Sequence, residues 1–133
     1  MAVVSTETVP VASEPDIVAV RRRVREVSIR LGFSLVDQTK VVTAASELAR
    51  NTLIHGGGGS MELVVLNGPR TGLKLTFADN GPGIADIQLA LRDGFTTGNG
   101  LGLGLGGAKR LVNEFEVSSQ PGEGTKVSVV RWK

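Results

Sequence analysis

Residues 79–84 read DNGPGI and come just after the apolar run LKLTF at 73–77. Asn-Gly and Gly-Pro pairs favour turns, because glycine accepts positive φ and proline fixes its own backbone. The stretch therefore predicts that a strand ends near Asp79 and that a tight turn follows. A plain turn is the simplest interpretation, and the rest of the sequence decides whether these residues also belong to a site.

Upstream of this turn, the pattern predicts one strand and two helices. Valines among serines and threonines in the first dozen residues indicate an edge strand. The segment SEPD at 13–16 carries a serine N-cap and a proline in the first turn, so it opens a helix that runs to Gly32. A second helix extends from about Asp37 to His55, where four glycines at 56–59 end it.

The remaining elements are predicted from alternation and turn signals. Strands are expected at 61–67 and 73–79, joined by a hairpin turn, and a closing strand at 126–132. A short helix is expected at 86–94, and AKRLVNEF at 108–115 has a helical pattern. Helices followed by paired strands predict an α+β fold, a two-layer α/β sandwich.

Composition limits the class of protein. The 133 residues include 15 Lys and Arg against 13 Asp and Glu, only 4% aromatics and no cysteine. From this length we expect a single domain over residues 1–133. We expect no nucleic-acid partner, because a basic stripe with interleaved aromatics is missing. No apolar run approaches the roughly 18 residues of a membrane span, so we expect a cytoplasmic protein with no membrane partner.

The second predicted helix has two distinct faces. Its apolar residues fall within one arc of the helix: Val41, Val42, Ala45, Leu48, Ala49, Thr52 and Leu53. Glu47, Asn51 and His55 recur at a spacing of four, so they form a separate polar stripe. A solvated helix face would explain this stripe, and so would a site.

The segment GNGLGLGLGG at 98–107 alternates glycine with leucine and leads into the pattern at 108–115. A loop of this kind lets backbone N–H groups approach an anion, and phosphate is the natural occupant. A flexible linker would favour serine over leucine. No Gly-Lys-Ser or Gly-Lys-Thr follows, so this is not a P-loop, and no strand directly precedes it, so it is not a dinucleotide fingerprint.

Taken together, these stretches resemble the GHKL ATPases, the superfamily of gyrase, heat-shock chaperone, histidine kinase and MutL proteins. SELARNTLIHG at 46–56 resembles the N box, and DNGPGI at 79–84 the first glycine box. GLGLGL at 100–105 resembles the second glycine box, and GEGT at 122–125 a conserved final turn. The resemblance covers roughly residues 37–130 and implies a Bergerat-type fold, a mixed sheet covered on one face by helices.

The resemblance also implies roles for single residues, with ATP and Mg²⁺ as cofactors. Asp79 would accept a hydrogen bond from the adenine amino group, and Asn51 would be the metal ligand. Glu47 would be catalytic by polarising the attacking hydroxyl, and Thr125 would cap the adenine site through its hydroxyl. The full set of expected nucleotide-binding residues is Asn51, His55, Asp79, Gly81, Gly83, Ile84, Gly98, Gly100, Leu101, Gly102, Leu103, Gly104 and Thr125.

Within the superfamily, the chain resembles the RsbT family of serine/threonine-protein kinases almost end to end. DQTKVVTAASELARN, DGFTTGNGLGLGLGGAKRLVNEF and GEGTKVSVVRWK carry this resemblance. It implies STAS-domain scaffold and antagonist proteins as substrates and a regulatory phosphatase as a second partner. An RsbW-type anti-sigma factor and a nucleotide-gated adaptor with little turnover stay open as alternatives.

Two further expectations concern surfaces. The run RRRVR at 21–25 is either a solvated helix face or a basic patch for acidic partners, made of Arg21, Arg22, Arg23 and Arg25. RDGFTTGN at 92–99 has glycines on either side of two threonines, a pattern that suits a short lid.

Overall fold

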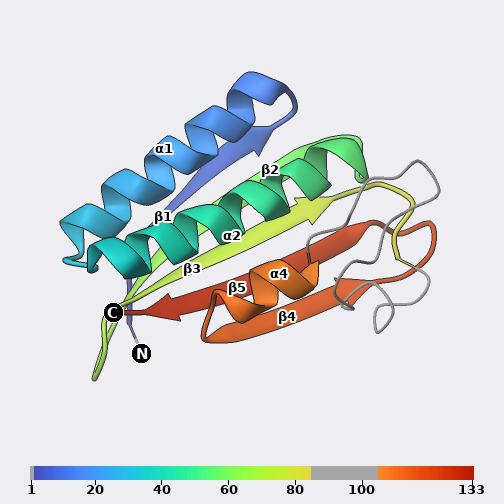
Figure 1. Cartoon of the computed structure of the whole chain (residues 1–133). Helices are drawn as coiled ribbons and strands as arrows, with labels where there is room; N and C mark the ends of the chain where they lie inside the picture. The colour runs from blue at the N-terminus through green and yellow to red at the C-terminus, as the bar shows by residue number, and fades with distance from the viewer. Residues whose placement is uncertain (1, 85–104) are drawn as a thin grey trace.

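The computed structural model describes residues 2–84 and 105–133, which form two layers, a sheet and a set of helices (Figure 1). The elements are, in chain order, β1 (Ala2–Val11), α1 (Glu14–Arg30), α2 (Leu35–Ile54), β2 (Gly59–Asn67), β3 (Gly72–Asp79), α4 (Leu105–Arg110), β4 (Glu114–Ser119) and β5 (Thr125–Trp132). The predicted α+β sandwich is confirmed. The short helix expected at 86–94 and the lid expected at 92–99 lie outside the described residues.

The sheet has the strand order β1-β2-β3-β5-β4, so β1 is an edge strand as predicted. All four pairings between the described strands are antiparallel, and the mixed character expected from the resemblance is not seen. The reason is topological. β3 and β4 run in the same direction, but β5 folds back and takes the place between them.

The hydrophobic core lies between one face of the sheet and the helices α1 and α2 (Figure 1). In α1 the residues at spacings of three and four, Ile17, Val20, Val24 and Val27, are buried. The predicted apolar arc of α2 is buried except Leu53, which is partly buried, and Ala44 joins it. Every second residue of β3 completes the core from the sheet side, with Phe77 nearly inaccessible.

The helix starts differ slightly from the predicted ones. α2 begins at Leu35, two residues before Asp37, because the side chain of Ser34 caps it by accepting a hydrogen bond from the backbone N–H of Asp37. Ser13 occupies the N-cap position of α1, but its side chain makes no capping bond. Here Asp16 accepts from the N–H of Ala12 instead, at 2.8 Å.

The helical pattern predicted for 108–115 is wrong in its second half. Helix α4 ends at Arg110, and Glu114 and Phe115 belong to strand β4. From Glu114 onward, exposed and partly buried side chains alternate with period two, and Phe115 pairs with Val129 of β5. Pairing with β5 therefore overrides the apolar spacing that suggested a longer helix.

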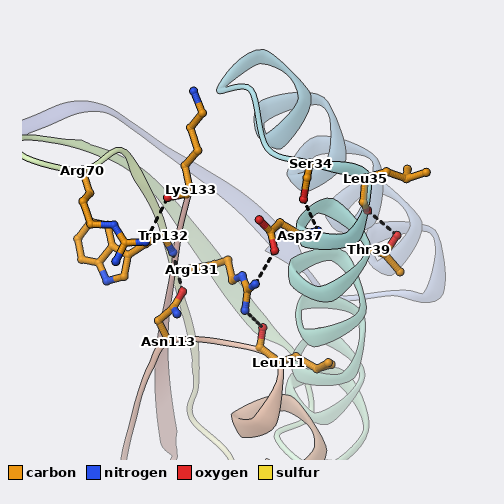
Figure 2. A network of polar contacts seen from close by, with 10 residues as sticks. All are labelled: Ser34, Leu35, Asp37, Thr39, Arg70, Leu111, Asn113, Arg131, Trp132 and Lys133. Atoms are coloured by element: carbon orange, nitrogen blue, oxygen red, sulfur yellow. Dashed lines mark hydrogen bonds and ion pairs between the residues drawn. The ribbon is translucent and has the colours of Figure 1, made fainter.

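A polar network fastens the beginning of α2 to β5 (Figure 2). The guanidinium of Arg131 forms an ion pair with Asp37 and also donates to the backbone oxygen of Leu111 at 3.2 Å. The hydrogen bond from Arg131 holds the pKa of Asp37 below its usual range. Next to it, the indole N–H of Trp132 donates to Glu114. This network lies at the end of the molecule where the chain terminates (Figure 1).

The basic run on α1 divides into paired and unpaired arginines. Arg23 donates to both carboxylate oxygens of Glu7, at 2.8 and 3.0 Å, so the predicted basic patch loses this residue. Arg21, Arg22 and Arg25 are exposed and form no ion pair within residues 2–84 and 105–133. None of the helices in those two ranges is long and apolar enough to cross a membrane.

Candidate functional site

A cavity of about 210 Å³ lies at the other end of the sandwich, where the C-terminal turn of α2 meets the end of β3 and the start of β5. Its apolar part comes from the core side: Leu48, Phe77, Ile84, Leu105 and Val127. Its remaining lining residues are Asn51, Thr52, His55, Gly56, Asp79, Pro82, Gly83 and Thr125. An apolar pocket with a few convergent polar groups is the usual form of a small-molecule site.

Within the described residues, the carboxylate of Asp79 is held by backbone N–H groups. Its Oδ1 accepts from the N–H of Gly81 at 2.9 Å and from the N–H of Thr125 at 3.2 Å. Its Oδ2 accepts no hydrogen bond, and no cation pairs with Asp79, within the described parts of the chain. The carboxylate is therefore fixed in orientation and keeps one oxygen available to a donor from a ligand.

Close packing around Asp79 explains several glycines. A Cβ on Gly56 would lie 2.3 Å from Cγ of Asp79, so only glycine lets the carboxylate approach the end of α2. Gly81 and Gly83, expected as nucleotide-binding residues, are also required by backbone packing. A Cβ on Gly81 would meet the backbone of Gly56 at 2.6 Å, and one on Gly83 would meet the carbonyl oxygen of Gln120 at 2.1 Å.

The segment after β3 is fastened to the turn between β4 and β5. Ser119 at the end of β4 accepts from the N–H of Ile84 at 2.8 Å and donates to the carbonyl oxygen of Gly124 at 2.9 Å. Its hydroxyl also lies 2.9 Å from the hydroxyl of Thr125. The N–H of Gly122 donates to the carbonyl oxygen of Pro82 at 2.7 Å. Ser119 thus connects both segments that enclose Asp79.

Asn51 lies one turn before the end of α2 and faces the cavity. Its side-chain nitrogen Nδ2 is buried and has no hydrogen-bond partner in the part of the chain that the structure describes. An amide that turns about its last bond would present its oxygen there, which is a ligand that Mg²⁺ accepts. No cluster of three acidic or histidine side chains that could hold a metal occurs within residues 2–84 and 105–133. Asn51 therefore fits a cation held mainly by ligand phosphates and water.

The structure brings together many of the predicted site residues from distant parts of the sequence. Those that line the cavity are Asn51, His55, Asp79, Gly83, Ile84 and Thr125. Glu47 does not line it and is exposed on α2, one turn before Asn51. Gly81 contacts Asp79 from outside the lining. The expected phosphate-binding residues Gly98, Gly100, Leu101, Gly102, Leu103 and Gly104 lie outside the described residues.

The expected set of site residues lacks Gly56, and it also lacks Ser119 behind the cavity. Gly56 ends the N-box segment and is the first of the four glycines expected to stop the helix, but its position beside Asp79 depends on the register of β2 and β3. Ser119 carries no local signal, because a serine near the end of a strand is common. Its role arises only from the packing of three segments.

Comparisons with known proteins place this chain in a family. Residues 36–133 match the family described as histidine kinase-, DNA gyrase B- and HSP90-like ATPases. The chain therefore belongs to this family of ATPases. It is also 46% identical, over 93% of its length and 94% of the relative's, to serine/threonine-protein kinase RsbT of Bacillus subtilis. Within the ATPase family, the chain thus belongs to the serine/threonine-protein kinases of the RsbT type.

Other relatives are more distant. The anti-sigma F factor of a Thermoanaerobacter species is 31% identical over 77% of the chain and 76% of that protein. A crystal structure of the RsbU and RsbW domains of a Mycobacterium tuberculosis protein superposes with a TM-score of 0.67. It has 20% sequence identity and covers 96% of this chain and 32% of that chain, so it supports the fold alone.

Proposed function

We propose that the protein transfers the γ-phosphoryl group of ATP to serine or threonine residues of STAS-domain partner proteins, as part of a partner-switching stress response. The observation that carries the proposal is the Asp79 carboxylate, which is oriented by two N–H groups and offers one open oxygen in the cavity. An acceptor-only group suits the donor N–H of an adenine amine. Apolar side chains such as Phe77 and Val127 supply surface for the ring.

The phosphates would extend toward Asn51 and the glycine-rich residues 98–104. Bound Mg²⁺ would neutralise charge on the phosphate oxygens, with Asn51 as its protein ligand. The buried Nδ2 of Asn51, which has no partner among the described residues, supports this role, because a buried polar group without a partner is costly and a ligand would relieve that cost.

Glu47 is the proposed catalytic residue. Its exposure suits a group that must meet the hydroxyl of a partner protein rather than contact the base. The spacing of four residues puts Glu47 and Asn51 on the same side of α2. Phosphoryl transfer depends mainly on positioning and charge neutralisation, and Glu47 would orient the incoming hydroxyl.

The partners are proposed from the relatives. The RsbT relative supports a serine/threonine-protein kinase. We further propose that its substrates are STAS-domain scaffold and antagonist proteins and that it activates a regulatory phosphatase by binding it. We further propose that it works in the cytoplasm, where ATP and such partners meet. The anti-sigma F factor relatives favour a second candidate function, the binding of a sigma factor. A pull-down distinguishes the two, since STAS proteins and a phosphatase support the first and a sigma factor the second.

The decisive experiment compares two variants of neighbouring residues on α2. Glu47→Ala should bind MgATP and the STAS partner nearly as the wild type does but transfer phosphate about 10²- to 10⁴-fold more slowly, the usual contribution of general-base help. Asn51→Ala should lose both Mg²⁺-dependent ATP binding and transfer. Radiolabelled phosphate on the purified partner measures transfer, and calorimetry measures binding.

Arg50→Ala serves as a control, because this side chain is also exposed on α2 and has no assigned role. Wild-type transfer by Glu47→Ala would refute the catalytic role. A wild type that binds ATP but never phosphorylates the partner would favour the nucleotide-gated adaptor.

A further inference from the structure

Ser119 is the hub of the hydrogen-bond network behind the cavity, and its three contacts determine where its single hydrogen lies. The N–H of Ile84 can only donate, so Ser119 Oγ accepts from it, at 2.8 Å. The carbonyl oxygen of Gly124 can only accept, so the Ser119 hydroxyl donates to it, at 2.9 Å. A serine hydroxyl has one hydrogen and two lone pairs. The hydrogen of Ser119 is therefore already used.

The third contact of Ser119 follows from this count. The Thr125 hydroxyl lies 2.9 Å from Ser119 Oγ, and one of the two atoms must donate. Because Ser119 has no second hydrogen, Thr125 is the donor. The Thr125 hydroxyl then points its only hydrogen away from any ligand, and its oxygen keeps lone pairs that can accept. Thr125 lines the cavity, so Ser119 makes it an acceptor there.

Asp79, like Thr125, presents a hydrogen-bond acceptor to the cavity. The two N–H groups on Oδ1 leave Oδ2 as an acceptor, and a carboxylate has no hydrogen to give. The N–H of Thr125 itself is one of the two donors, so the two acceptors belong to one connected group. The cavity wall around Asp79 therefore presents acceptors from both residues.

We propose that Ser119 is a specificity-determining residue, which fixes Thr125 as an acceptor and so makes the cavity select a 6-amino purine over a 6-oxo purine. An exocyclic amine has two hydrogens to offer such a wall, whereas a 6-oxo group offers only lone pairs. A site built for one hydrogen-bonding pattern rejects the opposite one, because its own buried groups are left unpaired. The inference rests on the proposed ATP binding and adds the group that orients Thr125.

Removing the Ser119 hydroxyl should change selectivity more than affinity. In Ser119→Ala, the hydroxyl of Thr125 loses its acceptor and is free to rotate, so it can donate to an oxygen at the purine 6-position. A merely structural role for Ser119 predicts something else. If its loss only loosened the segment at Ile84, the binding of all nucleotides would weaken alike and the ratio of their dissociation constants would stay unchanged.

The experiment measures dissociation constants of MgATP and magnesium inosine triphosphate by calorimetry. Inosine triphosphate carries an oxygen in place of the 6-amino group and a hydrogen on N1. We expect the wild type to prefer ATP by about tenfold or more. Ser119→Ala should lower this preference about three- to tenfold, which is the change in affinity that one hydrogen bond accounts for. Ser118→Ala, an exposed neighbour on the same strand, should leave it unchanged.

A double-mutant cycle with Thr125→Val tests the route through Thr125. Valine removes the hydroxyl at similar size, so Thr125→Val alone should lower the preference. In that background, Ser119→Ala should have no further effect on the ratio beyond about twofold. Thr125→Ser, which keeps a hydroxyl, should retain the wild-type preference.

Each remaining outcome separates the two proposals. If the wild type binds neither nucleotide, the proposed function fails. If the wild type prefers ATP but Ser119→Ala keeps that preference, or lowers it equally in the Thr125→Val background, only the role of Ser119 is overturned. Should Ser119→Ala not fold, an unchanged preference in Thr125→Val overturns the inference by itself.

Discussion

Two aspartates at opposite ends of the sandwich differ in what holds them. Asp37, in the first turn of α2, forms an ion pair with Arg131, which lowers its pKa (Figure 2). Asp79, at the end of β3, is held only by backbone N–H groups and has one oxygen without a partner in the described residues. The 20 residues of α2 separate the two regions by about 30 Å, at roughly 1.5 Å per residue.

The difference shows how one small domain assigns stability and binding to separate ends. A carboxylate neutralised by arginine has little capacity left for a ligand, and its charge stabilises the packing of α2 on β5. A carboxylate oriented by uncharged N–H groups keeps its charge and an acceptor for a donor from outside. Surroundings rather than residue type therefore distinguish the structural aspartate from the binding one.

Of the effects that test this comparison, the largest is expected on ATP binding at Asp79. Asp79→Asn should weaken MgATP binding about ten- to a hundredfold, because it removes a charged acceptor worth roughly 1.5–3 kcal/mol. Its melting temperature should change little, since an amide oxygen can still accept from Gly81 and Thr125. Asp37→Asn is the matched control, and it should lower stability while ATP affinity stays the same. Equal ATP affinity in Asp79→Asn and the wild type, measured by calorimetry, would remove Asp79 from the site.

The next effect tests the structural end. Arg131→Met should lower the free energy of unfolding by roughly 1–2 kcal/mol, because it breaks a charged hydrogen bond in a pair that solvent still partly reaches. Arg131→Lys keeps the charge but not the two-armed geometry, so it should lose less. ATP affinity should be retained in both variants. Chemical denaturation that finds Arg131→Met as stable as the wild type would contradict this role.

The stability lost in Arg131→Met depends on pH, and the direction of the Asp37 pKa shift determines how. Asp37 has a lowered pKa in the folded state, so its pair contributes fully above the ordinary aspartate pKa of about 3.9. The contribution is lost as the pH falls through the lower folded-state value. The stability gap between the wild type and Arg131→Met should thus be constant near neutral pH and narrow below about pH 4. A gap that widens on acidification would show that Asp37 is not the partner that matters.

The smallest effect concerns a surface that belongs to neither end. Arg22 and Arg25 on α1 form no ion pair in the described parts of the chain and offer positive charge to an acidic partner. Reversing both charges should therefore slow association a few-fold at low salt and less at high salt. Reversing the charges of Lys74 and Lys126, on the other side of the sheet, changes the net charge by the same amount and should not slow association. Surface plasmon resonance at two salt concentrations measures the association rates. Equal rates for both double variants would show that Arg22 and Arg25 do not form a binding surface.

Much of the fold could be predicted because its signals are local. The apolar spacing of α1 and α2, the hairpin at 61–79 and the stop at the four glycines follow from helix and strand periods. The order of the N box and the glycine boxes predicts that Asn51 and Asp79 belong to one site. The predicted helix at 108–115 failed because its apolar spacing also fits a strand, and the open edge of β5 decided in favour of the strand.

The sequence by itself determined which residue types were available: a carboxylate after a strand, an amide on a polar stripe, and glycines wherever the backbone must come close. Only the tertiary structure decided that Gly56 must make room for Asp79, that Arg131 pairs with Asp37 rather than remaining at the surface, and that Ser119 orients Thr125. The physical reason is the distance along the sequence over which each kind of interaction acts. Periodicity and turn chemistry act over a few residues, whereas these contacts join segments that are brought together only when the sheet has formed.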